Sequence, residues 1–207
     1  MMKRIDTDAI STRPEDRLRF LEDFVGFTDD DWTALRASTE VLVPRMAALV
    51  DALYEQVLAY DDTRRIFAGV GGTIDPLYVE VRKQHLVGWI RATVAAGPDS
   101  RSEFANYLNV IGRRHTGLAG DPRRVVPPRY MVALVSFIQT TFTTTFFEAL
   151  ADEPERALRF ATAWNKMLMI QLEMFLKNIA PQWPQWDEPR ICSTEEYPHD
   201  APTARFA

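Results

Sequence analysis

The chain has a single cysteine, Cys192, among its 207 residues. One thiol cannot form an internal disulfide framework, and it excludes the paired-cysteine motifs that bind metals or attach a cofactor covalently. Such low cysteine usage is compatible with a reducing compartment. We therefore expect a cytoplasmic protein without disulfides.

Long hydrophobic runs are also missing. The first 25 residues alternate charged and apolar groups, and the longest apolar run, residues 130–138, is interrupted by Ser136. A membrane span or the core of a signal peptide needs a longer uninterrupted stretch. The sequence predicts neither a membrane partner nor export by a visible signal.

Positive charge is not in excess either. The chain has 24 Lys and Arg against 29 Asp and Glu, a formal net charge of −5, and its basic residues are scattered. The basic stripe of a nucleic-acid-binding protein is therefore lacking. With 46% hydrophobic and 11% aromatic residues, the chain can bury the core of one globular domain.

Apolar residues recur at helical spacing, and no alternating run predicts a strand. Prolines and glycines mark the expected helix ends. The fold class is therefore all-α, and seven or eight helices of unequal length suit a globin-like arrangement better than a four-helix bundle. The predicted helices span residues 14–25, 28–43, 44–60, 76–96, 101–116, 127–151 and 154–180, with a short turn at 61–67. This divides the chain into an N-terminal segment (1–13), a helical domain (14–180) and a Pro-rich, irregular tail (181–207).

His115 is the candidate metal ligand. It lies at the end of a predicted helix, and Gly112, almost one turn earlier, has no side chain to block a large flat ligand beside the imidazole. A lone helical histidine is more often a surface or core residue, and the local sequence leaves that alternative open. Other metal sites lack support, because the chain has no His-Glu-x-x-His motif and no cysteine cluster.

Four segments resemble the protoglobin and globin-coupled-sensor family over roughly residues 14–180. They are IGRRH ending at His115, VPPRYMVALVSFI starting at Val126, AWNKMLMIQLEMFL starting at Ala163, and LVDALYEQVL, which contains Tyr54. The segment YVEVRKQHLVGWI aligns with the family's distal helix without a gap. The resemblance implies a single-domain protoglobin with an extra helix before the first ordinary globin helix.

The same resemblance implies that His115 is the proximal ligand of haem b, which would be noncovalent because no cysteine pair can attach it. The ligands would be the diatomic gases O2, CO and NO. Tyr54 occupies the family's hydrogen-bond donor position on the opposite face, and its alternative is a core tyrosine. Leu53 departs from the tryptophan that several protoglobins carry there. Leu86, and not the neighbouring His85, would face the iron.

The remaining haem pocket is expected to be apolar with a cationic rim. Each apolar candidate is also an ordinary core residue, and each cation is also compatible with a solvated surface. The apolar candidates are Leu53, Val57, Phe67, Leu86, Val87, Ile90, Leu134 and Ile138, with Gly112 beside the imidazole. Arg82 and Arg114 are the main candidates for the haem propionates, and Lys83 and Arg113 lie next to them.

Three functions fit this reading. The first is reversible gas binding by a carrier. The second is a haem enzyme acting on NO, nitrite or peroxide, although no residue beyond Tyr54 points to such chemistry. The third is a gas-sensing signalling module that forms a homodimer through its two long C-terminal helices, as the family and the apolar breadth of residues 130–150 and 156–179 suggest.

Overall fold

The computed structural model describes residues 12–69, 71–116 and 125–179, and these residues are predominantly helical. Their one β feature is an isolated bridge between Ala68 and Ile74. The all-α fold class is confirmed, whereas the predicted tail lies outside the described residues. The helices are α2 (Pro14–Val25), α3 (Asp29–Ala37), α4 (Thr39–Leu42), α5 (Met46–Leu58), α6 (Asp61–Arg64), α7 (Pro76–Ala95), α8 (Arg101–Arg114), α9 (Pro128–Ala149) and α10 (Pro154–Ile179).

Local signals place several helix ends where the sequence predicts them. Gly26 ends α2 in the left-handed conformation, with φ 65°, which glycine adopts without steric cost. Thr28 and Asp31 form a capping box at the start of α3, in which the Thr28 N–H donates to Asp31 Oδ2 at 2.8 Å. The Asp75 carboxylate caps α7 by accepting from the Tyr78 N–H at 3.1 Å.

One predicted helix, residues 28–43, is wrong as a single element. The structure divides it into α3 and α4 at Ser38, which is completely buried. The Ser38 hydroxyl donates to the Leu35 carbonyl at 2.7 Å and accepts from Trp164 Nε1 at 2.8 Å. Such a side-chain bond to the backbone competes with the helical pattern. Pro44 likewise lies in a 3-10 turn, Val43–Arg45, before α5 begins.

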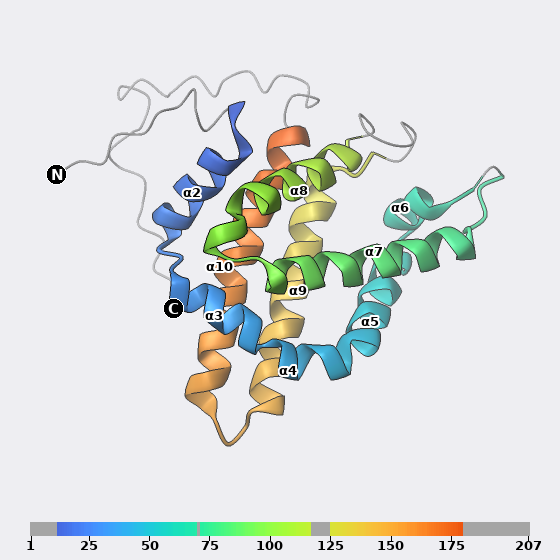
Figure 1. Ribbon diagram of the computed structural model, residues 1–207. Coiled ribbons are helices and arrows are strands. Elements are labelled where there is room, and N and C mark those ends of the chain that lie inside the picture. Colours follow the sequence, from blue (N-terminus) through green and yellow to red (C-terminus); the bar gives the residue numbers. More distant parts are fainter. Residues whose placement is uncertain (1–11, 70, 117–124, 180–207) are drawn as a thin grey trace, which may run out of the picture.

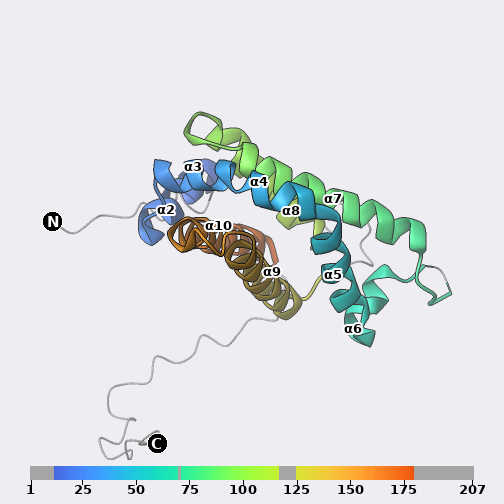
Figure 2. The same ribbon diagram turned by 90° about the horizontal axis from the view of Figure 1, so that it is seen from below.

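Helices α9 and α10 form a long antiparallel pair that runs the length of the molecule (Figure 1). The other described helices form an arc around one side of this pair (Figure 2). Helix α8 packs mainly on α10 and α2, whereas α7 packs mainly on α5 and α3. Helix α7, which carries Leu86, and helix α8, which His115 follows directly, therefore pack on different neighbours.

Aromatic packing holds the long pair together. Phe142 of α9 meets the buried Trp164 of α10 edge-on, with ring centroids 4.9 Å apart, and Phe146 meets Phe160 at 5.6 Å. Edge-to-face pairs contribute about 0.5–1.5 kcal/mol each beyond their buried area. By length and composition alone α9 could cross a membrane, but a core helix passes the same test. Its buried face packs against α10, α4 and α5.

Candidate functional site

The end of α8 fixes the position and the tautomer of His115. The backbone carbonyl of His115 accepts from the Val126 N–H at 2.9 Å, which ties the end of α8 to the segment before α9. In the side chain, Nδ1 lies 2.8 Å from the Ile111 carbonyl. Because a carbonyl oxygen can only accept, Nδ1 carries the ring proton and Nε2 keeps its lone pair. A nitrogen in that state can bind a metal ion.

The surroundings of His115 also keep the ring neutral. Burial lowers its pKa, the bond to Ile111 opposes this effect, and the positive charge of Arg82 lowers the pKa further. The ring packs beside Phe175 of α10, with centroids 6.1 Å apart. At neutral pH the imidazole is therefore uncharged, as metal ligation requires.

Tyr54, the predicted hydrogen-bond donor, lies on α5. It is 8% exposed, and its ring meets Phe67 edge-on at 5.8 Å, while Phe67 contacts Tyr78 of α7 at 5.9 Å. Burial raises the pKa of Tyr54 well above its usual range, and the charge of Arg82 acts against this shift. The phenol therefore stays protonated. Its hydroxyl makes no hydrogen bond to another described residue, so the O–H remains available as a donor.

An apolar pocket lies between α5, α7 and α9. It brings together four residues that the sequence predicts for the site, Leu53, Leu86, Ile90 and Ile138. The other predicted apolar residues do not line this pocket but are partly buried against the hydrophobic core: Val57, Phe67, Val87 and Leu134. Four further lining residues were not expected from the sequence: Leu49, Val50, Trp89 and Phe142.

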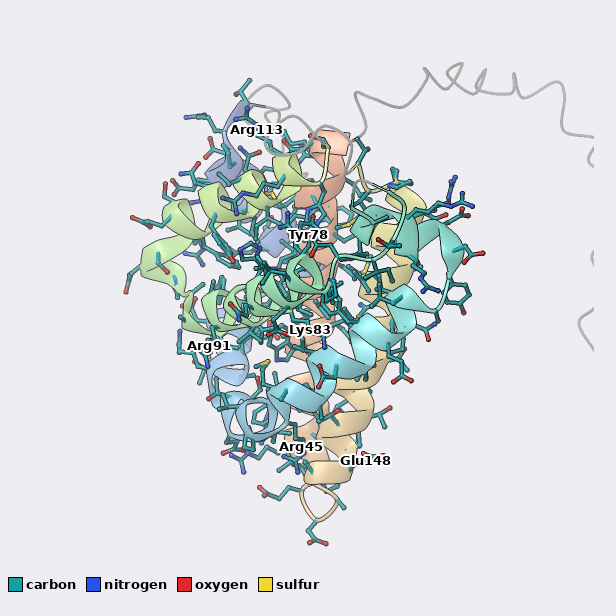
Figure 3. The ribbon with its side chains drawn as sticks, turned by 90° about the vertical axis from the view of Figure 1, so that its right-hand side faces the viewer. Arg45, Tyr78, Lys83, Arg91, Arg113 and Glu148 are labelled. Carbon is teal, nitrogen blue, oxygen red and sulfur yellow. The ribbon has the colours of Figure 1, made fainter. Side chains whose placement is uncertain are left out.

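The predicted cations differ in their partners. Lys83 lies on the side of α7 that faces α5, where it pairs with Asp51 at 2.6 Å (Figure 3). Arg114 is exposed at the end of α8. Arg82 of α7 donates from Nη1 to His85 Nδ1 at 3.1 Å, and its guanidinium lies 4.8 Å from the Tyr78 ring centroid.

His85 itself is exposed, whereas Leu86 lines the apolar pocket. Partial desolvation lowers the pKa of His85, and the charges of Arg82 and then Arg114 lower it further. These two arginines, from α7 and α8, therefore act on the same imidazole. They place positive charge near His85.

Gly112 does not leave room for a flat ligand beside His115, so that prediction from the sequence is wrong. A Cβ at this position would lie 2.7 Å from Asn178 Nδ2, 3.1 Å from Phe175 Cα and 3.3 Å from the Met174 carbonyl oxygen. The missing side chain therefore admits the backbone of α10, and the space is not left for a flat ligand. The glycine acts on the site indirectly, because it lets α8 press His115 against Phe175.

A glycine-to-alanine pair tests this role. Gly112→Ala should lower the free energy of unfolding by about 1–3 kcal/mol, because the backbone of α10 cannot yield as a flexible side chain can. Gly88→Ala is the matched control, since Gly88 lies inside α7 and its added methyl meets nothing within 4 Å. That control should gain about 0.5–1 kcal/mol from the lost freedom of the unfolded chain. Urea unfolding followed by circular dichroism measures both, and equal changes would contradict the close packing at Gly112.

Some of the residues that sequence reasoning missed could have been found from the sequence, and one could not. Leu49 and Val50 precede Leu53 by one helical turn, and Trp89 follows Leu86 by three residues, so helical spacing alone could have found them. Phe175 has no such signal. It lies on α10, far from His115 in the sequence, and only the packing around Gly112 brings the two rings together.

The residues of this region are of the kinds that a haem would need. They include a neutral imidazole with Nε2 available, a protonated phenol on α5, an apolar pocket lining and two arginines. Each is a feature that a porphyrin with a metal centre and two carboxylates requires. No group of three or more His, Cys, Asp or Glu able to hold a metal ion occurs among the described residues. Metal binding through His115 alone therefore needs a cofactor that brings its own ligands.

Two comparisons with known proteins found matches to this chain. The family model described as Protoglobin matches residues 14–180. A solved structure, the globin domain of the Geobacter sulfurreducens globin-coupled sensor, superimposes with a TM-score of 0.64. It is 17% identical, and the match covers 77% of this chain and 95% of that one. None of the curated proteins matches the chain. At that identity the solved structure shows the fold, which is globin-like.

Proposed function

Because the chain belongs to the protoglobin family, we propose that it binds haem b noncovalently through His115 and takes up the gases O2, CO and NO reversibly. A globin-type role in gas binding follows from the family. The cofactor, the ligand set and the site residues are our proposal. A cytoplasmic location, expected from the single cysteine, belongs to the same proposal.

The observation that supports this proposal best is the hydrogen bond from His115 Nδ1 to the Ile111 carbonyl at 2.8 Å. It orients the ring, fixes the tautomer and leaves Nε2 as the only nitrogen able to donate a lone pair. A satisfied core histidine would have partners on both nitrogens, and no second one occurs among the described residues.

The other residues then have separate roles. Haem would supply an iron able to bind a diatomic gas, and His115 would hold that iron through Nε2. Tyr54 would offer its O–H to the gas molecule, and it stays protonated because burial raises its pKa. Leu53, Leu86, Ile90 and Ile138 exclude water from the distal space. Arg114, which is exposed at the end of α8 and acts on the pKa of His85, is the cation that we assign to a haem propionate.

An absorption spectrum tests the proposal. The purified protein should contain one haem per chain, with a Soret band that shifts on reduction and again on addition of CO. Acidified organic solvent should extract the haem completely, because no cysteine pair can attach it. A protein that stays colourless after expression with excess haem, and that does not take up haem in vitro, would contradict the proposal.

A homodimer is the second part of the proposal. The other described helices lie on one side of the α9 and α10 pair (Figure 2). Large apolar side chains remain exposed on both helices of the pair. On α10, Leu158 and Met169 are 57% and 47% exposed and share a face, because their spacing is close to three helical turns. On α9, Val132 and Phe147 are 47% and 41% exposed. We assign this surface to a second copy of the chain.

Charge substitution on that surface tests the dimer. Phe147→Glu and Met169→Glu together should give a monomer in sedimentation velocity, because the four carboxylates that they bring to the interface, two from each chain, are costly to desolvate. Leu77→Glu is the matched control, since Leu77 is also exposed, at 74%, but lies on α7. A wild-type protein that is monomeric at high concentration would contradict the assignment of this surface to a second copy of the chain.

Two further functions would need specific results. A haem enzyme acting on NO, nitrite or peroxide would show turnover with a reductant, whereas a carrier reacts only stoichiometrically. A gas sensor would change its oligomer size or its partner affinity on ligand binding. The described residues provide no acid, base or nucleophile beside Tyr54 that favours the enzyme.

A further inference from the structure

Arg82 has a buried nitrogen with no acceptor. Its Nε is shielded from solvent and has no hydrogen-bond partner among the described residues, although the residue as a whole is only partly buried. A guanidinium N–H removed from water and left unpaired costs free energy, because its hydration is lost without replacement. Within the described part of the chain, Arg82 therefore has one buried donor in excess, which an anionic or polar acceptor would satisfy.

The register of α7 places this donor on the Tyr54 side of the site. Tyr78, Arg82, Leu86 and Ile90 follow one another at intervals of four residues and form one ridge of α7. Leu86 and Ile90 line the apolar pocket, and Tyr78 contacts Phe67, which contacts Tyr54. Arg82 therefore lies on this ridge between Tyr78, which contacts Phe67, and Leu86, which lines the apolar pocket.

The neighbours of Arg82 hold the guanidinium without neutralising it. Its plane is near the Tyr78 ring, 4.8 Å from the centroid, and Nη1 donates to the neutral His85 imidazole at 3.1 Å. Neither contact supplies a negative charge. Lys83, the next residue, differs because it pairs with Asp51 at 2.6 Å. The positive charge of Arg82 also reaches Tyr54, where it opposes the larger effect of burial on the tyrosine pKa.

We propose that Arg82 is an anion-binding residue of the distal pocket, whose guanidinium stabilises small inorganic monoanions, such as azide or nitrite, held at the haem iron opposite His115. This inference rests on the proposed haem binding. It gives the pocket two donors of different kinds: the Tyr54 hydroxyl, which is neutral, and the Arg82 guanidinium, which is charged. The pocket would then favour anionic over neutral ligands of the same size.

Azide binding to the ferric haem-loaded protein tests the assignment, with imidazole as the neutral ligand. Arg82→Met should weaken azide binding about tenfold and leave imidazole binding within about twofold, because only the azide loses a charge-assisted bond. Lys83→Met is the matched control. It removes the same charge from the adjacent position, where Asp51 already pairs it, and it should change azide affinity less than about twofold. Arg82→Lys, which keeps the charge but not the planar fork, should lie between wild type and Arg82→Met.

A haem propionate is the other acceptor that Arg82 could serve, and reconstitution with haem dimethyl ester separates the two. If Arg82 binds the anionic ligand, its substitution weakens azide binding as much with the ester as with haem. An effect of Arg82→Met that disappears with the ester would overturn the proposal and make Arg82 a propionate partner. Azide affinity that is unchanged by Arg82→Met, or that falls in step with imidazole affinity, would overturn it as well.

A second readout does not depend on haem. Because Arg82 Nε has no acceptor among the described residues, Arg82→Met should not lower the melting temperature of the haem-free protein. A fall of several degrees would show that Arg82 is a structural residue and would overturn the assignment. Failure of the haem proposal itself is distinct, since the wild-type protein would then show no Soret band and no azide difference spectrum.

Discussion

Substitution of His115 by alanine should remove most of the haem that the wild-type protein carries. The imidazole is the only side chain that we assign to the iron, and its Nε2 is held available by the bond from Nδ1 to the Ile111 carbonyl. Without this ligand, the porphyrin keeps only its apolar contacts and its propionate pairs, which do not fix the iron. The haem-to-protein ratio, measured by absorbance after size exclusion, gives the result directly.

Two controls make this result specific. His85→Ala removes an exposed histidine on α7 and should leave the haem content and the spectrum unchanged. Added imidazole should restore a five-coordinate or six-coordinate spectrum to the His115→Ala protein, because it occupies the space that the side chain left. An unchanged spectrum of His115→Ala without added ligand would contradict the assignment of His115 as the iron ligand. Loss of haem in His85→Ala would indicate that both histidines contribute to haem binding.

Local sequence was sufficient for most of the fold. Helix ends at Gly26, Asp75 and Pro154 depend on residues within one turn, so their signals are complete in the sequence. The break at Ser38 is different. Its hydroxyl is held by Trp164 Nε1, which lies on a helix more than a hundred residues later, and no local pattern contains that partner.

The candidate site shows the same division. The resemblance to one family predicts His115, Tyr54 and Leu86 as site residues. Ile90, one helical turn after Leu86, and Leu53, next to Tyr54, are then predicted from their positions on the same helices. The role of Gly112 was misread because a missing side chain does not say which neighbour uses the space, and here that neighbour is α10. The unpaired Nε of Arg82 could not be predicted at all, since it depends on which acceptors are absent around it.

These roles divide the site by helix. Helix α8 holds His115 against α10, whereas Tyr54 and Arg82 come from α5 and α7, which pack on each other. Substitutions on α8 should therefore change haem retention, and substitutions on α5 and α7 should change ligand binding. A measurement that separates ligand release from haem loss is the right test for the distal residues.

Tyr54→Phe should speed the dissociation of dioxygen by roughly 5- to 150-fold, with haem content unchanged. The substitution removes only the hydroxyl, so the edge-on contact with Phe67 is preserved. Dioxygen takes up partial negative charge from ferrous iron, and a hydrogen bond to such an acceptor contributes about 1–3 kcal/mol, which corresponds to that range of rates. Stopped-flow displacement of dioxygen by CO measures the rate.

The two controls for Tyr54→Phe are a ligand and a variant. Bound CO carries far less negative charge, so its dissociation should change much less, and the ratio of the two effects separates hydrogen bonding from a change in pocket shape. Tyr107→Phe removes a hydroxyl from a half-buried tyrosine on α8, the helix of His115, and should leave both rates near their wild-type values. Equal acceleration of both ligands in Tyr54→Phe, or no change in either, would mean that Tyr54 is a core residue. Dioxygen would then be held by another group, and the Arg82 guanidinium is one candidate, because its charge already acts on the pKa of Tyr54.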